Sequence, residues 1–118
     1  MININYRDPR PIYEQVKDNF RQLIISGALP PDEKMLSVRE LAASLTINPN
    51  TIQRAYRELE AEGYICSVPG RGSFVCQQDA ALEARREELL SRFDALVGEL
   101  ALVGVGSDKL IQRLEAEK

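Results

Sequence analysis

Two short helices with well-defined N-terminal caps stand a few residues apart in the middle of the chain. Ser37-Val38-Arg39-Glu40 has the form of a capping box, in which the serine caps a backbone N–H group and the glutamate reaches back to the cap. Asn48-Pro49 supplies a favoured cap and a favoured first residue for a second helix. Because only residues 46–48 separate the two predicted helices, 38–45 and 49–62, the spacing predicts a helix-turn-helix.

The flanking segments predict one helix before this pair and a hairpin after it. Apolar residues recur at helical spacing over residues 11–26, and Gly27 is a natural helix end. Residues 64–68 and 73–76 are rich in strand formers, and Pro69-Gly70-Arg71-Gly72 joins them as a turn with a basic tip. A helix-turn-helix followed directly by such a hairpin is a winged helix.

The last third of the chain holds no proline and predicts a helix from about residue 79 to 103, then a short helix capped by Ser107. Apolar residues repeat along the longer helix at heptad spacing, which is typical of a seam that packs against another helix. The residues of this seam are Leu82, Leu89, Phe93, Leu96, Leu100 and Val103. The seam can pack on the winged helix of its own chain or on a second copy, and we expect the second copy, since no further chain covers it.

Together these patterns predict a mainly α fold with a small β-hairpin. A winged helix-turn-helix domain is expected over residues 1–77, followed by a short helical dimerisation tail with two helices over residues 78–118.

The composition excludes several kinds of chemistry. The 118 residues include no histidine and two cysteines, which leaves no His general base and too few ligands for a closed zinc site. No nucleophile–base pair and no phosphate-binding glycine loop is visible, so we expect no enzyme activity, no metal and no cofactor. No apolar run approaches ~18 residues and no signal peptide is visible, so we expect no membrane span and a cytoplasmic location.

The overall charge does not by itself favour a partner made of nucleic acid. The net charge is -3, whereas a nucleic-acid-binding domain is typically basic. Residues 1–78, however, hold nine basic and nine acidic residues, so the excess acid belongs to residues 79–118. The local pattern in residues 49–62 therefore carries more weight than the total.

Four polar residues fall on one face of the predicted helix 49–62, at positions i, i+3, i+4 and i+7. They are Asn50, Gln53, Arg54 and Arg57. Arginine, asparagine and glutamine are the side chains that pair bidentately with base edges in a major groove. Both arginines precede the acids Glu58, Glu60 and Glu62, so the start of the helix is free of acids and suits an approach to phosphate. A solvated polar face is the alternative, and the helix-turn-helix context favours DNA reading.

Two further basic residues stand where DNA could reach them. Arg39 lies in the first turn of helix 38–45, beside Ser37, where it can reach a phosphate or the groove edge; the alternatives are an ordinary exposed surface arginine or a partner for Glu40 or Glu33. Arg71 lies at the hairpin tip between two glycines, and a narrow minor groove attracts arginine. An ordinary glycine turn with an incidental arginine is the alternative there, and we favour a DNA contact for both residues.

The cysteines and tyrosines are expected to have structural roles. Counting outward from a turn at 69–72 places Cys66 opposite Val75, so Cys76 falls one residue out of register. A cross-strand disulfide needs specific geometry and an oxidising compartment, so we expect small buried or half-buried residues rather than a redox switch. The tyrosines expected to pack are Tyr6, Tyr13, Tyr56 and Tyr64, with Tyr56 also able to touch phosphate.

Six segments form an ordered series along the first two thirds of the chain. They are Pro11-Ile12-Tyr13-Glu14-Gln15-Val16, Leu36-Ser37-Val38-Arg39-Glu40-Leu41-Ala42, Asn48-Pro49-Asn50-Thr51-Ile52, Ala55-Tyr56-Arg57-Glu58-Leu59-Glu60, Gly63-Tyr64-Ile65 and Gly70-Arg71-Gly72-Ser73-Phe74-Val75. In this order and spacing they resemble the GntR family of bacterial transcription regulators. The resemblance covers about residues 10–76, and the short two-helix C-terminal region is similar to that of the YtrA-like subgroup.

The resemblance implies a homodimeric, usually repressing, regulator that binds a palindromic DNA operator. Helix 49–62 would enter the major groove and the 69–72 wing would lie at the minor groove. The residues expected at the DNA are Ser37, Arg39, Asn48, Asn50, Thr51, Gln53, Arg54, Arg57, Gly70, Arg71 and Gly72. Some relatives carry arginine where this chain has Pro49, so that contact is absent or replaced.

Two other readings compete with this one. A winged-helix module that binds a protein instead of DNA would suit the acidic balance, and an enzyme is the weakest alternative. The tail alone is too small to enclose a ligand pocket of about 300 Å³. A small-molecule effector, whose identity the sequence does not reveal, would therefore bind at the dimer interface or between the tail and the winged helix.

Overall fold

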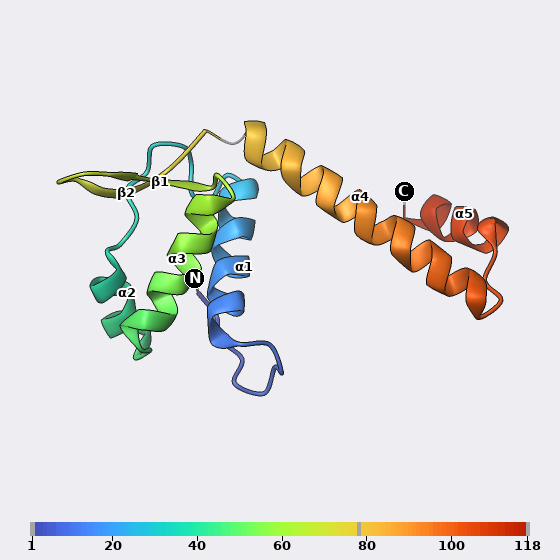
Figure 1. The fold of residues 1–118 in the computed structure, drawn as a ribbon, viewed down its shortest axis with the longest axis horizontal. Helices are drawn as coiled ribbons and strands as arrows, with labels where there is room; N and C mark the ends of the chain where they lie inside the picture. Colours follow the sequence, from blue (N-terminus) through green and yellow to red (C-terminus); the bar gives the residue numbers. More distant parts are fainter. Residues whose placement is uncertain (1, 78, 118) are drawn as a thin grey trace. The chain divides into compact units, whose positions relative to one another are not determined.

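The computed structural model describes residues 2–77 and 79–117, and over these residues the chain forms five helices and one two-stranded hairpin (Figure 1). The elements are α1 (Ile12–Ile25), α2 (Val38–Leu45), α3 (Pro49–Ala61), β1 (Ile65–Val68), β2 (Gly72–Val75), α4 (Asp79–Leu102) and α5 (Ser107–Ala116). The chain divides into two compact units, residues 1–82 and 83–118. Residue 78, with which the predicted C-terminal region begins, lies outside the described residues, as do residues 1 and 118.

The caps of α2 and α3 follow from their local sequence. The Oγ atom of Ser37 accepts a hydrogen bond from the Glu40 N–H at 3.1 Å, and Glu40 Oε1 accepts one from the Ser37 N–H at 3.0 Å. Both halves of the predicted capping box are therefore confirmed. The Asn48 side chain accepts a hydrogen bond from the Asn50 N–H at 2.8 Å, and Pro49 is the first residue of α3.

Two other caps lie one residue away from their predicted positions. Pro11 is the N-cap of α1 and not its first residue, because its ψ of 150° is extended and the helix begins at Ile12. Gly106 occupies the N-cap position of α5, with an extended backbone, and Ser107 is the first helical residue. Helix ends of this kind commonly shift by a residue, so the arrangement of the elements is unchanged.

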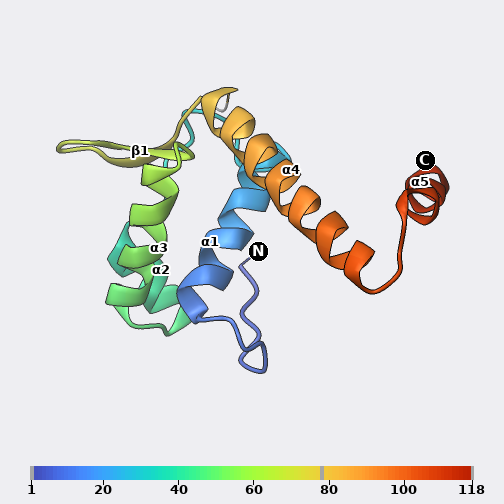
Figure 2. The same cartoon turned by 45° about the vertical axis from the view of Figure 1, so that its right-hand side comes forward.

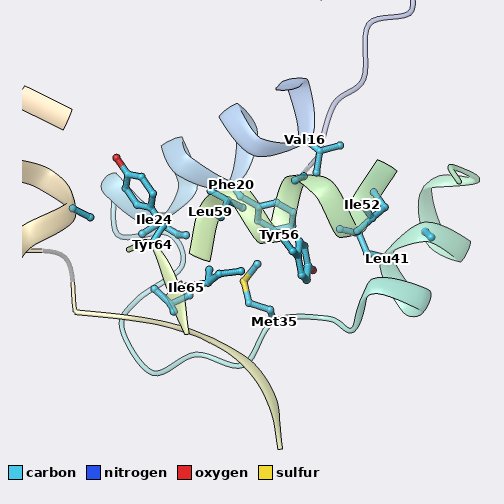
Figure 3. Close-up of a cluster of buried hydrophobic side chains, with 14 residues drawn as sticks. Val16, Phe20, Ile24, Met35, Leu41, Ile52, Tyr56, Leu59, Tyr64 and Ile65 are labelled. Carbon is cyan, nitrogen blue, oxygen red and sulfur yellow. The ribbon is translucent and has the colours of Figure 1, made fainter. Parts of the chain in front are cut away.

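The core of the first unit lies where α1, α2, α3 and the hairpin meet. Its buried hydrophobic residues are Val16, Phe20, Ile24, Met35, Leu41, Ala42, Ile52, Ala55, Tyr56, Leu59, Tyr64, Ile65, Val75 and Ala81. Helices α1 and α3 lie side by side in both views (Figure 1 and Figure 2). Between them the rings of Phe20 and Tyr56 meet edge to face at 5.8 Å (Figure 3), a favourable geometry for an aromatic pair. Ile52, Ala55 and Leu59 are fully buried, as the spacing along α3 predicts.

The hairpin is the outer part of a slightly larger sheet-like arrangement. The backbone N–H of Asp32 donates to the Val75 carbonyl at 2.8 Å, and the N–H of Met35 donates to the Ser73 carbonyl at 2.8 Å. A bridge between Lys34 and Phe74 completes this edge, so β2 is paired along both of its sides. The loop before α2 therefore fixes the base of the hairpin to the helical core.

The expectation for the two cysteines is wrong. Gly72 pairs with Val68 and belongs to β2, so the turn is shorter than predicted and Cys66 lies opposite Phe74 instead of Val75. Cys76 then falls diagonally from Cys66 on the same face of the hairpin. Their Cα atoms are 5.6 Å apart and the structure joins them in a disulfide. Both cysteines line an open hollow of about 650 Å³ on that face.

The second unit consists of the rest of α4 together with α5. After α4, Gly104 adopts a positive φ of 88°, and the Val105 N–H donates to the Leu100 carbonyl at 2.9 Å, which ends the helix as glycine commonly does. Helix α4 ends at Leu102, one residue short of the predicted helix end at 103. Large apolar residues remain exposed on both helices and at Val103, which directly follows α4. They are Leu89, Leu90, Phe93, Leu96, Leu102, Val103, Ile111 and Leu114. Among the described residues no helix combines the length and the apolar character needed to cross a membrane.

The disulfide leads to a test on the native protein. We expect the non-reduced protein to show no reactive thiol and the reduced protein to show two, one for each cysteine. Closing a loop over a sequence separation of 10 stabilises the fold by about 2–3 kcal/mol through the lower entropy of the unfolded chain. Urea denaturation of the double variant Cys66→Ala/Cys76→Ala should show a loss of this size. Two reactive thiols in the folded, non-reduced protein would contradict the pairing.

Candidate nucleic-acid interface

The polar side of α3 faces away from the core. Tyr56 and the residues Ile52, Ala55 and Leu59 anchor the opposite side of the helix in the first unit. The residues predicted to reach DNA from this helix and its cap are Asn48, Asn50, Thr51, Gln53, Arg54 and Arg57; Thr51 is half-buried and the other five are exposed. The structure therefore brings the predicted polar residues together on one open face.

The start of α2 adds two of the predicted residues. Ser37 and Arg39 are both exposed. The Ser37 Oγ atom already accepts the capping hydrogen bond, and its hydroxyl hydrogen can still donate to a phosphate oxygen. In the part of the chain that the structure describes, no ion pair joins Arg39 to Glu40 or Glu33, which was its alternative role.

The wing tip is a tight turn that presents Arg71. The Arg71 N–H donates to the Val68 carbonyl at 2.9 Å, with Pro69 and Gly70 between them and a φ of 76° at Gly70. Proline followed by a residue with positive φ is the pattern of a type II turn, which requires glycine or asparagine at that position. Arg71, Gly70 and Gly72 are all exposed, so the side chain and the backbone of the tip are both accessible.

The acids at the end of α3 pair mainly with α1 and the hairpin, and Glu58 also pairs with Arg54 of the polar face at 3.4 Å. Glu58 and Glu62 both pair with Lys17 of α1, and the Glu58 Oε1 to Lys17 Nζ distance is 3.1 Å. Arg21 pairs with Glu62 at 3.3 Å and also with Asp18. These pairs neutralise the acids along the seam between α1 and α3.

The third acid of the helix is engaged in another direction. Glu60 accepts a hydrogen bond from the Ser67 N–H of β1 at 3.0 Å, which joins the end of α3 to the hairpin. The structure therefore gives Glu58, Glu60 and Glu62 each a partner within the first unit.

The pKa values along the seam reflect these pairs. Burial of Lys17 lowers its pKa, but hydrogen bonds with Glu62 and Glu58 outweigh that effect and the net pKa is raised. The hydrogen bond from Lys17 is the main reason why the pKa of Glu58 lies below its ordinary value. Both groups therefore stay charged near neutral pH, and the seam remains a set of closed ion pairs.

Two of the four tyrosines behave differently from the sequence prediction. Tyr56 is buried and its hydroxyl donates to the Leu36 carbonyl at 2.7 Å, so it does not reach phosphate. Burial, with a smaller effect from Glu40, raises the pKa of Tyr56 to about 12. Tyr6 is 73% exposed and does not pack in the core.

Tyr13 is the residue at this face that sequence reasoning missed. Its ring lies 3.7 Å from the central carbon of the Arg54 guanidinium, and Arg54 Nη2 donates to the Tyr13 hydroxyl at 3.0 Å. The two residues are 41 positions apart in the chain and meet only because α1 packs against α3. Helical spacing within α3 alone could not reveal this pair.

The comparison with known proteins agrees with this geometry. Residues 12–75 match the family described as bacterial regulatory proteins, gntR family. The chain belongs to the gntR family. Its members are transcription regulators with a helix-turn-helix for DNA binding, so this chain is a regulator and not an enzyme.

Three proteins illustrate what this gntR-family chain is similar to in sequence and structure. The HTH-type transcriptional repressor YtrA of Bacillus subtilis is 36% identical over 112 residues, which is 93% of this chain and 86% of the relative. This agreement extends through the tail and supports the YtrA-like subgroup. A transcriptional antiterminator from Listeria monocytogenes has a similar structure, with a TM-score of 0.79 and 34% identity over 99% of this chain and 88% of that one. AraR(DBD), solved in complex with operator ORR3, gives a TM-score of 0.55 and 31% identity over 63% of this chain and 89% of that one.

The ion pairs between α1 and α3 are expected to stabilise this gntR-family domain. Lys17→Met removes the cation shared by Glu58 and Glu62, and we expect the free energy of unfolding at pH 7 to fall by about 1–2 kcal/mol. The lysine is largely enclosed, with a side-chain exposure of 14%, so the loss should exceed that of a surface pair. Lys109→Met on α5 is the control, since Lys109 is exposed and lies in the second unit.

The same pairs predict a dependence of stability on acid. Because the pKa of Glu58 is lowered in the folded state, its contribution is complete above its ordinary value of 4.5 and is lost as the pH falls through the folded value. Urea denaturation between pH 7 and pH 3 should therefore show a steeper acid loss in the wild type than in Lys17→Met. Equal acid profiles for the two proteins would contradict the assignment.

Proposed function

We propose that this protein is a repressor that binds a palindromic operator as a homodimer. In this proposal α3 enters the major groove and the wing at residues 69–72 lies along the minor groove. The observation that carries the proposal is the exposed polar face of α3, whose neighbouring acids Glu58 and Glu62 are engaged by Lys17 and Arg21. A helix N-terminus and exposed arginines suit an anionic duplex.

Each group of exposed residues would have a distinct task on the duplex. Gln53, Arg54 and Arg57 would read base edges, since their side chains are those that pair with bases in the major groove. Arg39 would hold the phosphate backbone and Arg71 would enter the narrow groove. The remaining predicted residues, Ser37, Asn48, Asn50, Thr51, Gly70 and Gly72, would complete the contact surface.

The second half of the proposal is the homodimer, with DNA binding in residues 1–77 and dimerisation in residues 78–118. Leu89 and Phe93 are each 44% exposed, Leu96 continues the same stripe of α4, and Val103 directly follows the end of the helix at Leu102. Leu100 on this stripe is half-buried in the second unit, and Leu82 is half-buried in the first. Monomeric proteins rarely leave so continuous an apolar surface in water, and its heptad spacing suits a second copy of the same helix.

Repression and location complete the proposal. The YtrA relative of Bacillus subtilis is named a transcriptional repressor. A dimer of this protein bound at its operator would likewise block transcription. We place the protein in the cytoplasm, where the DNA is. Cytoplasmic thiols keep most disulfides reduced, so the proposed DNA-bound form does not depend on the Cys66–Cys76 bridge.

Charge reversal on α3 tests the reading helix. The double variant Arg54→Glu/Arg57→Glu should lose at least about 100-fold in affinity for the operator, because each arginine contact is worth roughly 5- to 150-fold. Lys109→Glu/Arg113→Glu on α5 is the matched control, with the same change of net charge at exposed residues outside the proposed DNA interface and off the apolar stripe of α4. Fluorescence anisotropy at one stated salt concentration measures both variants. Unchanged affinity in the α3 variant would favour the module that binds a protein.

Substitution on the stripe of α4 tests the dimer. Leu89→Asp and Phe93→Asp should each give monomers with weak operator affinity, because a carboxylate would be buried in the dimer seam without a partner. Leu102→Asp is the control, since Leu102 is 87% exposed and falls on a different side of α4. Sedimentation equilibrium gives the assembly state, and a dimer in the Leu89→Asp and Phe93→Asp variants would contradict this part of the proposal.

A further inference from the structure

We propose that Tyr13 of α1 is a positioning residue of the DNA interface, which holds the guanidinium of Arg54 in place for reading one base pair. This inference rests on the proposed function, because it assigns Arg54 to a base edge. Its consequence is that the preference of the protein at that base pair depends on a tyrosine outside the helix-turn-helix.

The first support is the geometry of the pair. The Arg54 guanidinium stacks on the Tyr13 ring, with its central carbon 3.7 Å from the ring centroid. Arg54 Nη2 also donates to the Tyr13 hydroxyl at 3.0 Å, and that hydroxyl donates in turn to Glu14 Oε1 at 3.3 Å. A cation over an aromatic face is attracted by the electron density of the ring, and a hydrogen bond fixes its direction within that plane.

The second support is that Tyr13 is itself held in place. Its side chain is half-buried and packs against the hydrophobic core of the first unit. The ring therefore has the rigidity of the core, and Arg54 acquires part of that rigidity through the stack. An exposed arginine without such a support would have to lose many rotamers when it binds DNA.

The third support comes from the ion pairs of the seam. Glu58 Oε2 accepts a hydrogen bond from Arg54 Nε at 3.4 Å, while Glu58 Oε1 is bound to Lys17 at 3.1 Å. Lys17 of α1 thus holds the Glu58 carboxylate in place, and that carboxylate in turn holds the Nε atom of Arg54. Tyr13 and Glu58 together orient Arg54 from two directions.

This support leaves Arg54 able to bind a base. Of the five N–H hydrogens of a guanidinium, one on Nε and one on Nη2 are used, so the two on Nη1 and one on Nη2 remain. Arg54 is also 57% exposed in the stacked position, so the contact with the ring leaves much of its side chain open to solvent. Pairing with guanine requires two such donors in one plane.

Arg57 provides an internal comparison. It lies three residues further along the same face of α3 and is exposed, and in the described part of the chain its side chain has neither an ion pair nor an aromatic contact. Substitution of Tyr13 should therefore weaken discrimination at the base pair read by Arg54 and leave the contribution of Arg57 to DNA affinity unchanged.

The experiment is a double-mutant cycle on base-pair discrimination, with the full-length protein. Wild type first selects an operator from random duplexes, and each base pair of that operator is then replaced in turn. Arg54→Ala identifies the base pair whose replacement no longer changes affinity. Tyr13→Leu, which keeps an apolar side chain against the core, should lower discrimination at that base pair by roughly 2- to 10-fold.

The other variants separate positioning from a merely structural role. Tyr13→Phe keeps the stack and should retain most of the discrimination. Tyr13→Leu should have no further effect in the Arg54→Ala protein but its full effect in the Arg57→Ala protein. Tyr6→Ala is the matched control, since Tyr6 is an exposed tyrosine of the same unit. Thermal unfolding of every variant shows that the fold is kept.

The outcomes distinguish this inference from the proposed function. If wild type selects no sequence, the proposed function fails, and the inference falls with it. If wild type selects an operator but the Tyr13 substitution acts equally in the Arg54→Ala and wild-type backgrounds, the inference alone is overturned. A loss spread evenly over all base pairs, or tighter operator binding by Tyr13→Leu, would also overturn it.

Discussion

The burial of one side of α3 is the constraint on which the rest of the molecule depends. Ile52, Ala55 and Leu59 are completely buried in the core, where α3 packs against α1, α2 and β1, and full burial of a large apolar side chain stabilises a fold by about 1.5–3 kcal/mol. These residues fix the rotation of the helix about its own axis. Because α3 cannot rotate, its polar residues have a defined direction, and the face proposed to read DNA is formed before any DNA is bound.

The packing of α3 on α1 also determines which charged groups meet. The chain as a whole is acidic, yet the acids nearest to the polar face of α3 are directed at Lys17, Arg21 and the backbone of β1. Arg57 on this face is exposed, and Arg54 stays 57% exposed although it pairs with Glu58. This sorting explains how a gntR-family domain with no excess of basic residues can present a cationic face, and why net charge alone would have excluded the correct class of protein.

Much of the fold could be predicted because its signals are local. The capping box at Ser37 and Glu40, the Asn48 cap and the apolar spacing of α3 each determine structure within a few residues, and each is confirmed. The register of the hairpin could not be predicted in this way. It depends on whether Gly72 joins the turn or the strand, and the loop at residues 32–35, which pairs with β2, contributes to that choice.

The exposed positions of the candidate site were also predictable, since they are the complement of a buried stripe. The partners of those positions were not, because the contacts of Arg54 with Tyr13 and of Glu58 with Lys17 join residues 41 positions apart. Such pairs arise from the packing of α1 on α3. They are visible only after the helices have been placed together.

The most direct test of the account is the selection of binding sites from random duplex DNA by the full-length protein, at a stated salt concentration near the physiological value. The account predicts enrichment of an inverted repeat, whose two halves would reflect sequence reading by α3 and the twofold symmetry of a dimer. A folded protein that enriches no sequence would contradict the central claim that the exposed face of α3 reads DNA.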